Sequence, residues 1–412
     1  RSWSTASCWT SSTGSAEVLA ARAGAAAAAV ATLALVLAGC SQGGNESTVT
    51  ITGTPPASPQ TSGVPVAPSS SATPSVTPSS TPSTTPSDPP GPPAVVEEIA
   101  TGLQAPWGLG FLPDGDALVT ERDTRAVYRI SGPDHVLDQV GTIEAAAPQG
   151  EAGLLGLAVS PTFERDGLVY FYISTASDNR VVRARLTDAG LGPIEPIFTG
   201  IPNGYIHDGG RLVFGPDGFL YVSTGEGGEP ARAQDRDGLG GKILRLTAAG
   251  RPAPGNPFGT AVWSWGHRNV QGLAFDDRGR LWASEFGQDT YDELNRIEKG
   301  ANYGWPEVEG EGGRGQGFVD PQQVWDTDDA SPSGLAYVDG HLWMAALKGE
   351  RLWRVGLEGG RAVDPTAYFI GDYGRVRALA DTPQGQLWVM TSNRDTRGDP
   401  GPDDDKILLV QP

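Results

Sequence analysis

The sequence predicts an all-β fold, a six-bladed β-propeller, over residues 94–412. Two observations lead to this prediction: a glycine-containing turn recurs at a regular interval, and apolar, strand-like segments flank each copy. The six turn glycines lie 45 to 61 residues apart, at Gly115, Gly167, Gly218, Gly279, Gly340 and Gly385. A period of about forty to sixty residues, with a tight hairpin in each unit, is typical of propeller blades.

The segments around each turn read as short strands. Before Gly218, for example, the chain runs through Val213 and Phe214, and Leu220 to Val222 follow it. A sheet of this size cannot bury both of its faces alone, so six of them are expected to pack radially around an axis. A two-sheet sandwich is the alternative architecture, but its strands would not return at so regular an interval.

The two ends of this region support closure of the ring. Residues 95–100 and residues 406–410 are both strand-like. We expect them to share one blade, because pairing the first strand with the last removes an open sheet edge.

The chain before residue 94 has a different character. A short apolar run from Ala23 to Leu37 ends in the sequence LAGC at Cys40, and it is too brief to span a bilayer as an ordinary helix. It resembles the lipobox of bacterial lipoproteins, so residues 1–39 are expected to be a lipoprotein signal peptide and Cys40 the lipidated residue. An Ala/Leu-rich leader without that role is the alternative.

Residues 40–93 are rich in Ser, Thr and Pro and offer little apolar surface to bury. Such a segment is expected to remain disordered and to act as a tether between Cys40 and the propeller. The sequence therefore predicts an extracytoplasmic domain that is lipid-anchored to the bacterial cell membrane, with the anchor as its only membrane contact.

Charge and cysteine content narrow the class of partner. The formal net charge is -19, and the only two cysteines are Cys8 and Cys40, so residues 94–412 contain no disulfide. Nucleic acid is not an expected partner, because phosphate binding requires a cationic face. An acidic domain is compatible with calcium binding.

Of the four histidines, His207 has a promising context. It lies in the polar, glycine-rich segment IHDGGR, just before an apolar strand. A neutral imidazole at the mouth of a propeller can accept a proton from an alcohol near neutral pH. The alternative is a turn histidine whose ring binds backbone groups.

Several cations suggest an anionic ligand. Arg268 and Asn269 stand together before a predicted strand, and Arg375 and Arg377 alternate so that both face the same side of another. Lys348 follows an apolar strand in a loop. Guanidinium groups offer forked donors to carboxylates, so the set favours an anionic ligand, with inter-blade ion pairs and surface solvation as the alternatives.

A segment rich in oxygen ligands follows Arg268 in the chain. Ca²⁺ prefers carboxylate and carbonyl oxygens, which are supplied here by Glu285, Gly287, Gln288, Asp289, Asp292 and Glu293. An acidic turn without metal is the alternative. The segment does not resemble an EF-hand loop, and no Cys or His spacing suggests zinc.

Three motifs in these regions resemble a known family. They are GHRNVQGLAF at residues 266–275, DELN at residues 292–295 and GANYGWP at residues 300–306. They are similar to the soluble pyrroloquinoline quinone (PQQ) dehydrogenases that act on glucose and other aldose sugars, the glucose/sorbosone dehydrogenase family. The resemblance runs from about residue 102 to residue 410.

The resemblance implies a role for each matching residue. His207 matches the general base, and Arg268, Asn269, Lys348, Arg375 and Arg377 match cofactor-binding residues. The carbonyls of Gly287 and Gln288 match ligands of the calcium that holds the quinone, while Glu293 and Tyr303 match a calcium site of the aldose sugar branch. Glu151 aligns with a substrate contact. The family's glucose enzymes carry an acid at the position of Ile206 and a proline at that of Gln288, so the aldose branch is the closer one.

The resemblance thus implies PQQ- and Ca²⁺-dependent oxidation of aldose sugars at the anomeric carbon to lactones, with His207 as general base and hydride transfer to PQQ. The sequence leaves the preferred sugar and the electron acceptor open. Two alternatives remain: a calcium-dependent lactonase or esterase propeller, and a non-catalytic propeller that binds carbohydrate or protein.

Overall fold

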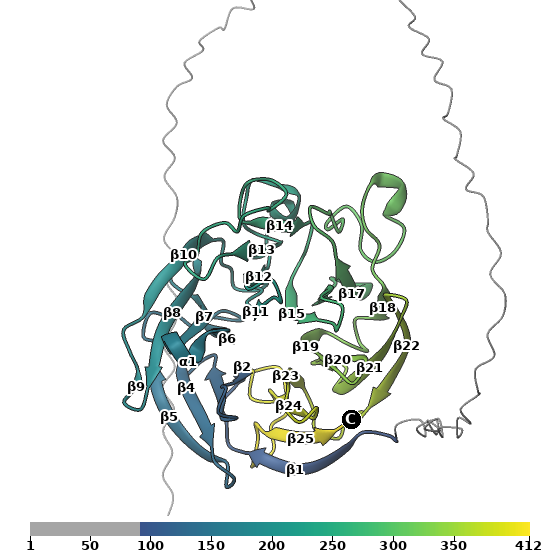
Figure 1. The fold of residues 1–412 in the computed structure, drawn as a ribbon. Coiled ribbons are helices and arrows are strands. Elements are labelled where there is room, and N and C mark those ends of the chain that lie inside the picture. Colours follow the sequence, from purple (N-terminus) through teal and green to yellow (C-terminus); the bar gives the residue numbers. More distant parts are fainter. Residues whose placement is uncertain (1–90) are drawn as a thin grey trace, which may run out of the picture. The chain divides into compact units, whose positions relative to one another are not determined.

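The computed structural model describes residues 91–412. The expected signal peptide, Cys40 and nearly all of the expected tether lie outside the described residues. The described chain folds into six antiparallel sheets arranged around a central axis (Figure 1), which confirms the predicted six-bladed β-propeller. Within residues 91–412, no helix has the length and apolar character needed to cross a membrane.

Each blade is a sheet whose first strand lies nearest the axis. Blade 1 contains β2 (Pro106–Phe111), β3 (Ala117–Glu121), β4 (Ala126–Ser131) and β5 (Val136–Thr142). Blade 2 contains β6 (Leu154–Val159), β7 (Leu168–Ser174), β8 (Asn179–Thr187), β9 (Gly190–Leu191) and β10 (Glu195–Ile201). Blade 3 contains β11 (Leu212–Phe214), β12 (Leu220–Thr224), β13 (Lys242–Leu246) and β14 (Val262–Trp265).

The remaining blades follow the same order. Blade 4 contains β15 (Val270–Phe275), β16 (Leu281–Glu285), β17 (Tyr291–Ile297) and β18 (Gln323–Asp326). Blade 5 contains β19 (Pro332–Val338), β20 (His341–Ala346), β21 (Arg351–Glu358) and β22 (Arg361–Tyr368). Blade 6 contains β23 (Val376–Asp381), β24 (Leu387–Thr391), β25 (Ile407–Gln411) and β1 (Ala94–Ala100). The helical pieces are α1 (Phe163–Asp166), η1 (Pro230–Gln234) and η2 (Arg314–Gln316).

Blade 6 closes the ring by joining the two ends of the described chain. Its outer strand is β1, which pairs antiparallel with the last strand, β25, from Ala94 opposite Gln411 to Ala100 opposite Ile407. The expectation that these two segments share a blade is confirmed. This pairing covers the edge that β25 would otherwise expose and ties the two ends of the described chain together.

The predicted turns connect the first and second strands of each blade. All six turn glycines have positive φ, between 61° at Gly167 and 94° at Gly115, a conformation that glycine adopts without steric cost. The hydrophobic clusters lie between neighbouring blades. One of them joins Leu118 and Val127 of blade 1 to Val169 and Phe171 of blade 2, as expected for sheets that bury their faces against each other.

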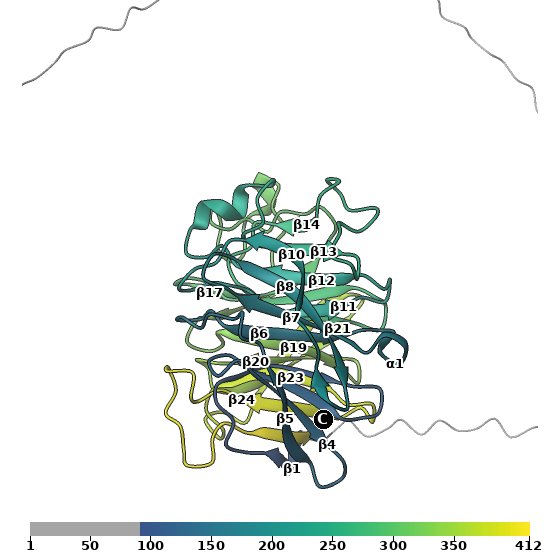
Figure 2. The same ribbon diagram turned by 90° about the vertical axis from the view of Figure 1, so that its left-hand side faces the viewer.

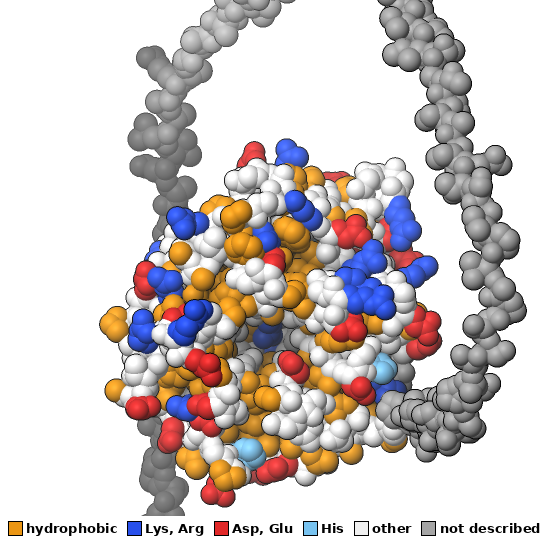
Figure 3. All heavy atoms as spheres, in the orientation of Figure 1, with side chains coloured by type: hydrophobic (Ala, Val, Ile, Leu, Met, Phe, Trp, Pro, Cys, Tyr) orange, Lys and Arg blue, Asp and Glu red, His pale blue; other side chains and the backbone are white. Residues whose placement is uncertain are grey.

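The antiparallel order gives the propeller two distinct faces. The six glycine turns and α1 lie on one face, and the loops that follow the second strand of each blade lie on the other (Figure 2). The turn face is hollowed at its centre (Figure 3), where the innermost strands end. A second cavity lies on the opposite face, where the innermost strands begin.

Candidate active site

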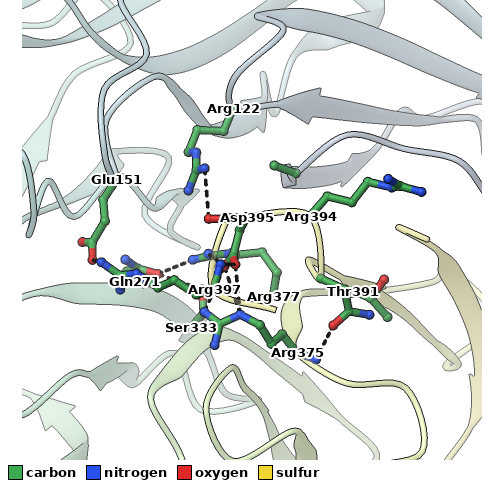
Figure 4. Close-up of polar contacts among 12 residues, drawn as sticks. Arg122, Glu151, Gln271, Ser333, Arg375, Arg377, Thr391, Arg394, Asp395 and Arg397 are labelled. Carbon is green, nitrogen blue, oxygen red and sulfur yellow. Dashed lines mark hydrogen bonds and ion pairs between the residues drawn. The ribbon is translucent and has the colours of Figure 1, made fainter. Parts of the chain in front are cut away.

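The cavity at the beginning of the innermost strands has a volume of about 70 Å³. All six blades contribute to it, through strand starts or the loops next to them. Figure 4 shows its polar side chains, with Arg375 and Arg377 directed at Asp395. Its lining residues are Trp107, Arg122, Gly150, Glu151, Tyr205, Gln271, Phe286, Leu347, Arg375, Arg377, Asp395, Thr396 and Arg397. We refer to this space as the arginine cavity.

The arginine cavity carries an excess of positive charge. Its lining contains four arginines and two carboxylates, and Arg122 also pairs with the adjacent Asp123 at 2.7 Å, so four minus three leaves one positive charge without a carboxylate partner. The whole chain has a formal charge of -19. A local positive field in an acidic protein selects anionic ligands.

Arg375 and Arg377 share one carboxylate at the floor of the arginine cavity. Both guanidinium groups bind Asp395 Oδ2, at 2.9 Å from Arg375 Nη2 and 3.0 Å from Arg377 Nη2. Although burial acts against it, the two arginines hold the pKa of Asp395 below its ordinary value. Arg377 Nη1 also donates to Gln271 Oε1 at 2.9 Å, while its buried Nε has no partner among residues 91–412. The prediction that the two arginines share one face is confirmed. The single negative charge of Asp395 balances only one of their two positive charges.

Arg268 lies in the turn between β14 and β15 and faces a different set of groups. Its guanidinium stacks on the Trp305 ring with 5.4 Å to the centroid, and Nη1 lies 3.4 Å from the carbonyl oxygen of Phe286. Burial lowers the pKa of Arg268. In the described part of the chain it forms no ion pair, and its buried Nε lacks a hydrogen-bond partner. A desolvated cation of this kind is a suitable partner for an anion.

Asn269 connects this turn to the loop that carries His207. Its side-chain Oδ1 accepts a hydrogen bond from Gly209 N at 3.0 Å, and Asn269 is 1% exposed. Lys348, in contrast, is not brought to the arginine cavity. Its side chain is 57% exposed and pairs with Asp328.

His207 is held in a left-handed backbone conformation with φ of 61°. Its ring Nδ1 lies 2.8 Å and 3.0 Å from the two carboxylate oxygens of Glu226, which is itself anchored by Gly228 N at 2.7 Å. The backbone N–H of His207 donates to Glu151 Oε2 at 2.9 Å. Because an ionised carboxylate only accepts, Nδ1 is the donor in this pair, and no group in residues 91–412 hydrogen-bonds to Nε2.

Glu151 connects His207 to the mouth of the arginine cavity. While Oε2 accepts from His207, Oε1 pairs with Arg397 Nη2 at 2.9 Å. Arg397 is 55% exposed in its side chain, so this ion pair lies at the solvent side of the cavity. Glu151 therefore lies between His207 and the more exposed Arg397.

The predicted calcium loop after β16 is organised around Glu309. The backbone N–H groups of residues 288–291 all donate to Glu309 Oε1, at 2.6 to 3.2 Å. Although partial burial acts against them, these hydrogen bonds hold the pKa of Glu309 below its ordinary value. The carbonyls of Gly287 and Gln288 accept no hydrogen bond from the described residues. A Cβ at position 287 would collide with the Tyr291 carbonyl, which explains the glycine.

The second predicted calcium pair, Glu293 and Tyr303, lines one small cavity together with Arg268. Burial and the neighbouring Glu285 raise the pKa of Glu293 to about 8. The Tyr303 hydroxyl donates to Arg296 O and accepts from Glu298 N, both at 2.8 Å, so that residue has only its carbonyl left for a cation. Within residues 91–412, His, Cys, Asp and Glu side chains form no group of three fit to hold a metal. A calcium ion here requires main-chain carbonyls, which this cation accepts as ligands.

Comparison with known proteins identifies the family. Residues 103–399 match the family described as Glucose / Sorbosone dehydrogenase. The chain belongs to this family. The PQQ-bound aldose sugar dehydrogenase of Streptomyces coelicolor has a solved structure with 52% sequence identity and a TM-score of 0.77, covering 79% of this chain and 99% of that one.

Two further similar proteins come from Escherichia coli. The aldose sugar dehydrogenase YliI of Escherichia coli (strain K12) is 29% identical over 333 residues, which cover 72% of this chain and 89% of the relative. The solved apo-form of a soluble aldose sugar dehydrogenase from Escherichia coli has 28% identity and a TM-score of 0.71, covering 78% of this chain and all of that one. The family and the oxidoreductase class expected from the sequence motifs are confirmed.

Sequence reasoning missed several residues at the site of this family member. The missed groups are Arg122, Glu226, Gln271, Glu309, Asp395 and Arg397. Three of these residues could have been found from their position in the repeat. Arg122, Glu226 and Asp395 all lie shortly after the second strand of a blade, and loops at equivalent positions of a propeller gather on one face.

Proposed function

We propose that this glucose/sorbosone dehydrogenase oxidises aldose sugars at the anomeric carbon to lactones, with PQQ and Ca²⁺ as cofactors and His207 as general base. One observation carries the proposal. A histidine whose Nδ1 is held by Glu226 and whose Nε2 is unoccupied lies next to Glu151, which lines a cavity with excess positive charge.

The arginine cavity fits the charge of PQQ, which bears three carboxylates. Arg375 and Arg377 share a single acid, and Arg268 has no ion pair among the described residues. Buried Nε atoms on Arg268 and Arg377 lack partners, and an anion that supplied them would relieve a desolvation cost. When bound, PQQ supplies an ortho-quinone that accepts the hydride from the sugar.

For calcium, the unused carbonyls of Gly287 and Gln288 are the proposed ligands of the ion that holds PQQ. Both lie in the loop next to Phe286, which lines the arginine cavity and accepts from Arg268. Calcium at this position would act as a Lewis acid on the cofactor. Glu293, with its raised pKa, and the Tyr303 carbonyl remain the proposed second calcium site.

The role of His207 follows from its two ring nitrogens. Glu226 fixes Nδ1 as the protonated nitrogen, which leaves Nε2 to accept the proton of the anomeric hydroxyl. The same carboxylate then stabilises the imidazolium that forms. Glu151 holds the backbone of His207 and faces the cavity, so it is placed to bind a sugar hydroxyl.

The lactonase alternative has less support. A hydrolytic calcium propeller needs several carboxylate and amide ligands around the axis, whereas the cavity near the axis here is lined by four arginines and two acids. A non-catalytic binding propeller would leave the His207–Glu226 pair without a purpose.

One assay separates these functions. The purified protein is mixed with PQQ and Ca²⁺, an artificial electron acceptor and a panel of aldoses. Dye reduction that requires both additives supports the proposal. Hydrolysis of lactones without PQQ would support the lactonase, and absence of dye reduction under every supplement would contradict the dehydrogenase function.

We further propose that the enzyme is held outside the cytoplasm by a lipid on Cys40. The support is the LAGC motif followed by the Ser/Thr/Pro-rich segment. Replacement Cys40→Ser should move the protein from the membrane fraction to the medium and abolish metabolic labelling with palmitate. Retention of the label in Cys40→Ser would contradict the anchor.

A further inference from the structure

One exposed aromatic side chain lines the arginine cavity. Tyr205 is 66% exposed, the largest exposed fraction among the large apolar side chains of residues 91–412. The other exposed ones, Val96, Val136, Tyr291 and Ile370, do not line this space. Single exposed apolar side chains are common on protein surfaces. The position of Tyr205 at the cavity, and not its exposure alone, therefore points to a role.

The backbone around Tyr205 is tied to Glu151. The backbone N–H of Glu151 donates to the carbonyl oxygen of Tyr205 at 3.0 Å, and Glu151 Oε2 accepts from the backbone N–H of His207 at 2.9 Å. Tyr205 and His207 are two residues apart, so their Cα atoms lie within about 7 Å of each other. The aromatic ring, the proposed base and the proposed substrate contact thus belong to one small hydrogen-bonded unit.

Gly150 leaves room for the Tyr205 side chain. A Cβ at position 150 would collide with the Tyr205 carbonyl and would sit 3.0 Å from both Cγ and Cδ1 of the ring. Gly150 also has a φ of 62°, which glycine adopts without steric cost. The base of the ring therefore lies against the Gly150 backbone, while most of the side chain is open to solvent. The Tyr205 hydroxyl forms no hydrogen bond within residues 91–412.

Polar groups stand beside this ring in the cavity lining. Glu151 and Arg397 form an ion pair there, and the Arg397 side chain is 55% exposed. A cyclic sugar carries hydroxyl groups around its edge and C–H groups on the faces of its ring. Carboxylate and guanidinium groups bind hydroxyls, and an aromatic face packs against C–H groups. The lining thus offers both kinds of contact that a cyclic aldose can use.

We propose that Tyr205 is the surface on which the sugar ring packs while its anomeric hydroxyl faces His207 Nε2. This inference rests on the proposed sugar dehydrogenase function and names a specificity-determining residue for it. Tyr205 favours aldoses in their cyclic form, because the ring presents a C–H face. An open-chain polyol carries similar hydroxyls without such a face.

Steady-state kinetics of the full chain loaded with PQQ and Ca²⁺ separates sugar binding from chemistry. Tyr205→Ala should raise the KM of the aldose that is oxidised fastest by about three- to tenfold, the usual effect of an aromatic contact. The kcat should stay within about twofold, because a contact made equally in the ground state and the transition state does not change the chemical step.

Two further variants serve as matched controls. Tyr205→Phe keeps the aromatic face and loses only the hydroxyl, so KM should stay within about twofold of the wild type. Ile370→Ala truncates another exposed side chain, 59% exposed and outside the arginine cavity, so it should leave both kcat and KM unchanged.

A second experiment measures binding without oxidation. The probes are 1,5-anhydroglucitol, which has a sugar ring but no anomeric hydroxyl, and sorbitol, an open-chain polyol. In calorimetric titrations the loaded wild type should bind 1,5-anhydroglucitol at least about threefold more tightly than sorbitol, and Tyr205→Ala should lose this preference. In saturation-transfer NMR, irradiation of aromatic protons should reach the C–H protons of 1,5-anhydroglucitol more strongly in the wild type and Tyr205→Phe than in Tyr205→Ala.

Several outcomes would overturn the proposal. An unchanged KM in Tyr205→Ala, or equal affinities of the wild type for the two probes, would exclude a ring contact. An equal rise of KM in Tyr205→Phe and Tyr205→Ala would assign the effect to the hydroxyl. A fall in kcat at constant KM would assign Tyr205 to the support of His207.

Failure of the dehydrogenase function would look different. The wild type would then reduce no dye with any aldose, whereas its preference for 1,5-anhydroglucitol and the loss of that preference in Tyr205→Ala would persist. That combination would keep the ring contact and reject the oxidation.

Discussion

Two histidines of this dehydrogenase each contact a glutamate through Nδ1, but their surroundings differ. His207 Nδ1 lies 2.8 Å from Glu226, and His267 Nδ1 lies 2.8 Å from Glu285. The difference is at the second nitrogen. His267 Nε2 lies 2.9 Å from Ser264 Oγ, and the whole residue is buried, whereas His207 Nε2 has no partner among residues 91–412.

The comparison teaches that a carboxylate on one nitrogen does not by itself make a histidine a base. The chain Ser264–His267–Glu285 has the bond pattern of a hydrolase triad, but its serine is fully buried and out of reach of a substrate. Glu285 also accepts from the backbone N–H of Arg268. His267 therefore stabilises the turn that carries Arg268, the proposed cofactor contact, while the Nε2 of His207 is left without a partner.

The largest expected effect comes from removing the available nitrogen. His207→Asn should lower kcat by about a hundredfold to ten-thousandfold, the usual range of general-base catalysis. PQQ affinity should remain within about threefold, because the proposed cofactor contacts lie on other residues. Steady-state kinetics and a PQQ titration of the same preparation measure both quantities. Full activity in this variant would show that another group accepts the proton.

The matching change at the buried histidine should act on stability. His267→Asn removes a ring that contacts Ser264 and Glu285 and stacks on Tyr303 at 4.7 Å. Leaving buried partners unsatisfied should lower the free energy of unfolding by about 2–4 kcal/mol. Urea unfolding measures the loss. If stability is unchanged while kcat falls as far as in His207→Asn, the contrast between the two histidines is wrong.

Next to His207, the buried carboxyl of Asp208 should make the stability of the protein depend on pH. Burial raises the pKa of Asp208 to about 6, even though Asn179 and Gly204 donate to its Oδ1. The folded state therefore holds this proton more tightly than the unfolded state. Below about pH 4 both states are protonated and there is no cost; stability then falls as pH rises to about 6 and stays lower above it.

Asp208→Asn removes that contribution. Between pH 4 and pH 7 the unfolding free energy of the wild type should fall by about 2 kcal/mol more than that of the variant, since one pKa unit corresponds to about 1.4 kcal/mol. Other raised acids, such as Asp292 and Asp405, affect both proteins equally and cancel in the difference. Parallel pH profiles for the two proteins would contradict the raised pKa of Asp208.

Glu226, the carboxylate of the proposed catalytic pair, should affect kcat less than the His207 ring that it holds. Glu226→Gln keeps the size of the side chain, but it loses the charge that orients Nδ1–H and stabilises the imidazolium. We expect kcat to fall about tenfold to hundredfold. The pH dependence of kcat should shift as well, which a purely structural role would not produce. An unchanged pH profile with a lower Tm would assign Glu226 to stability alone.

The sequence predicted the parts of this molecule that depend on local pattern. The number of blades could be predicted from the six turn glycines, because positive φ at a hairpin turn restricts the residue type. Closure of the ring could be predicted from the strand-like segments at the two ends of the domain. Arg375 and Arg377 were placed together by strand alternation. Glu226 and Asp395 were missed because their partners lie 19 and 20 residues away along the chain and across a blade, where no local pattern points to a contact.

Lys348 shows that the sequence does not reveal whether a charged side chain points into a site. Its replacement has the smallest expected effect on PQQ affinity. The family resemblance implies that it is a cofactor-binding cation, but its side chain is 57% exposed and paired with Asp328. An exposed ion pair is worth only about 0–1 kcal/mol. Lys348→Ala should therefore weaken PQQ binding by less than about threefold, whereas Arg375→Ala, which removes a buried guanidinium bound to Asp395, should weaken it at least about tenfold. PQQ titrations of both variants measure the ratio. If Lys348→Ala costs as much affinity as Arg375→Ala, the lysine must leave Asp328 and turn toward the cofactor when PQQ binds, and the arrangement described here would be that of the cofactor-free site.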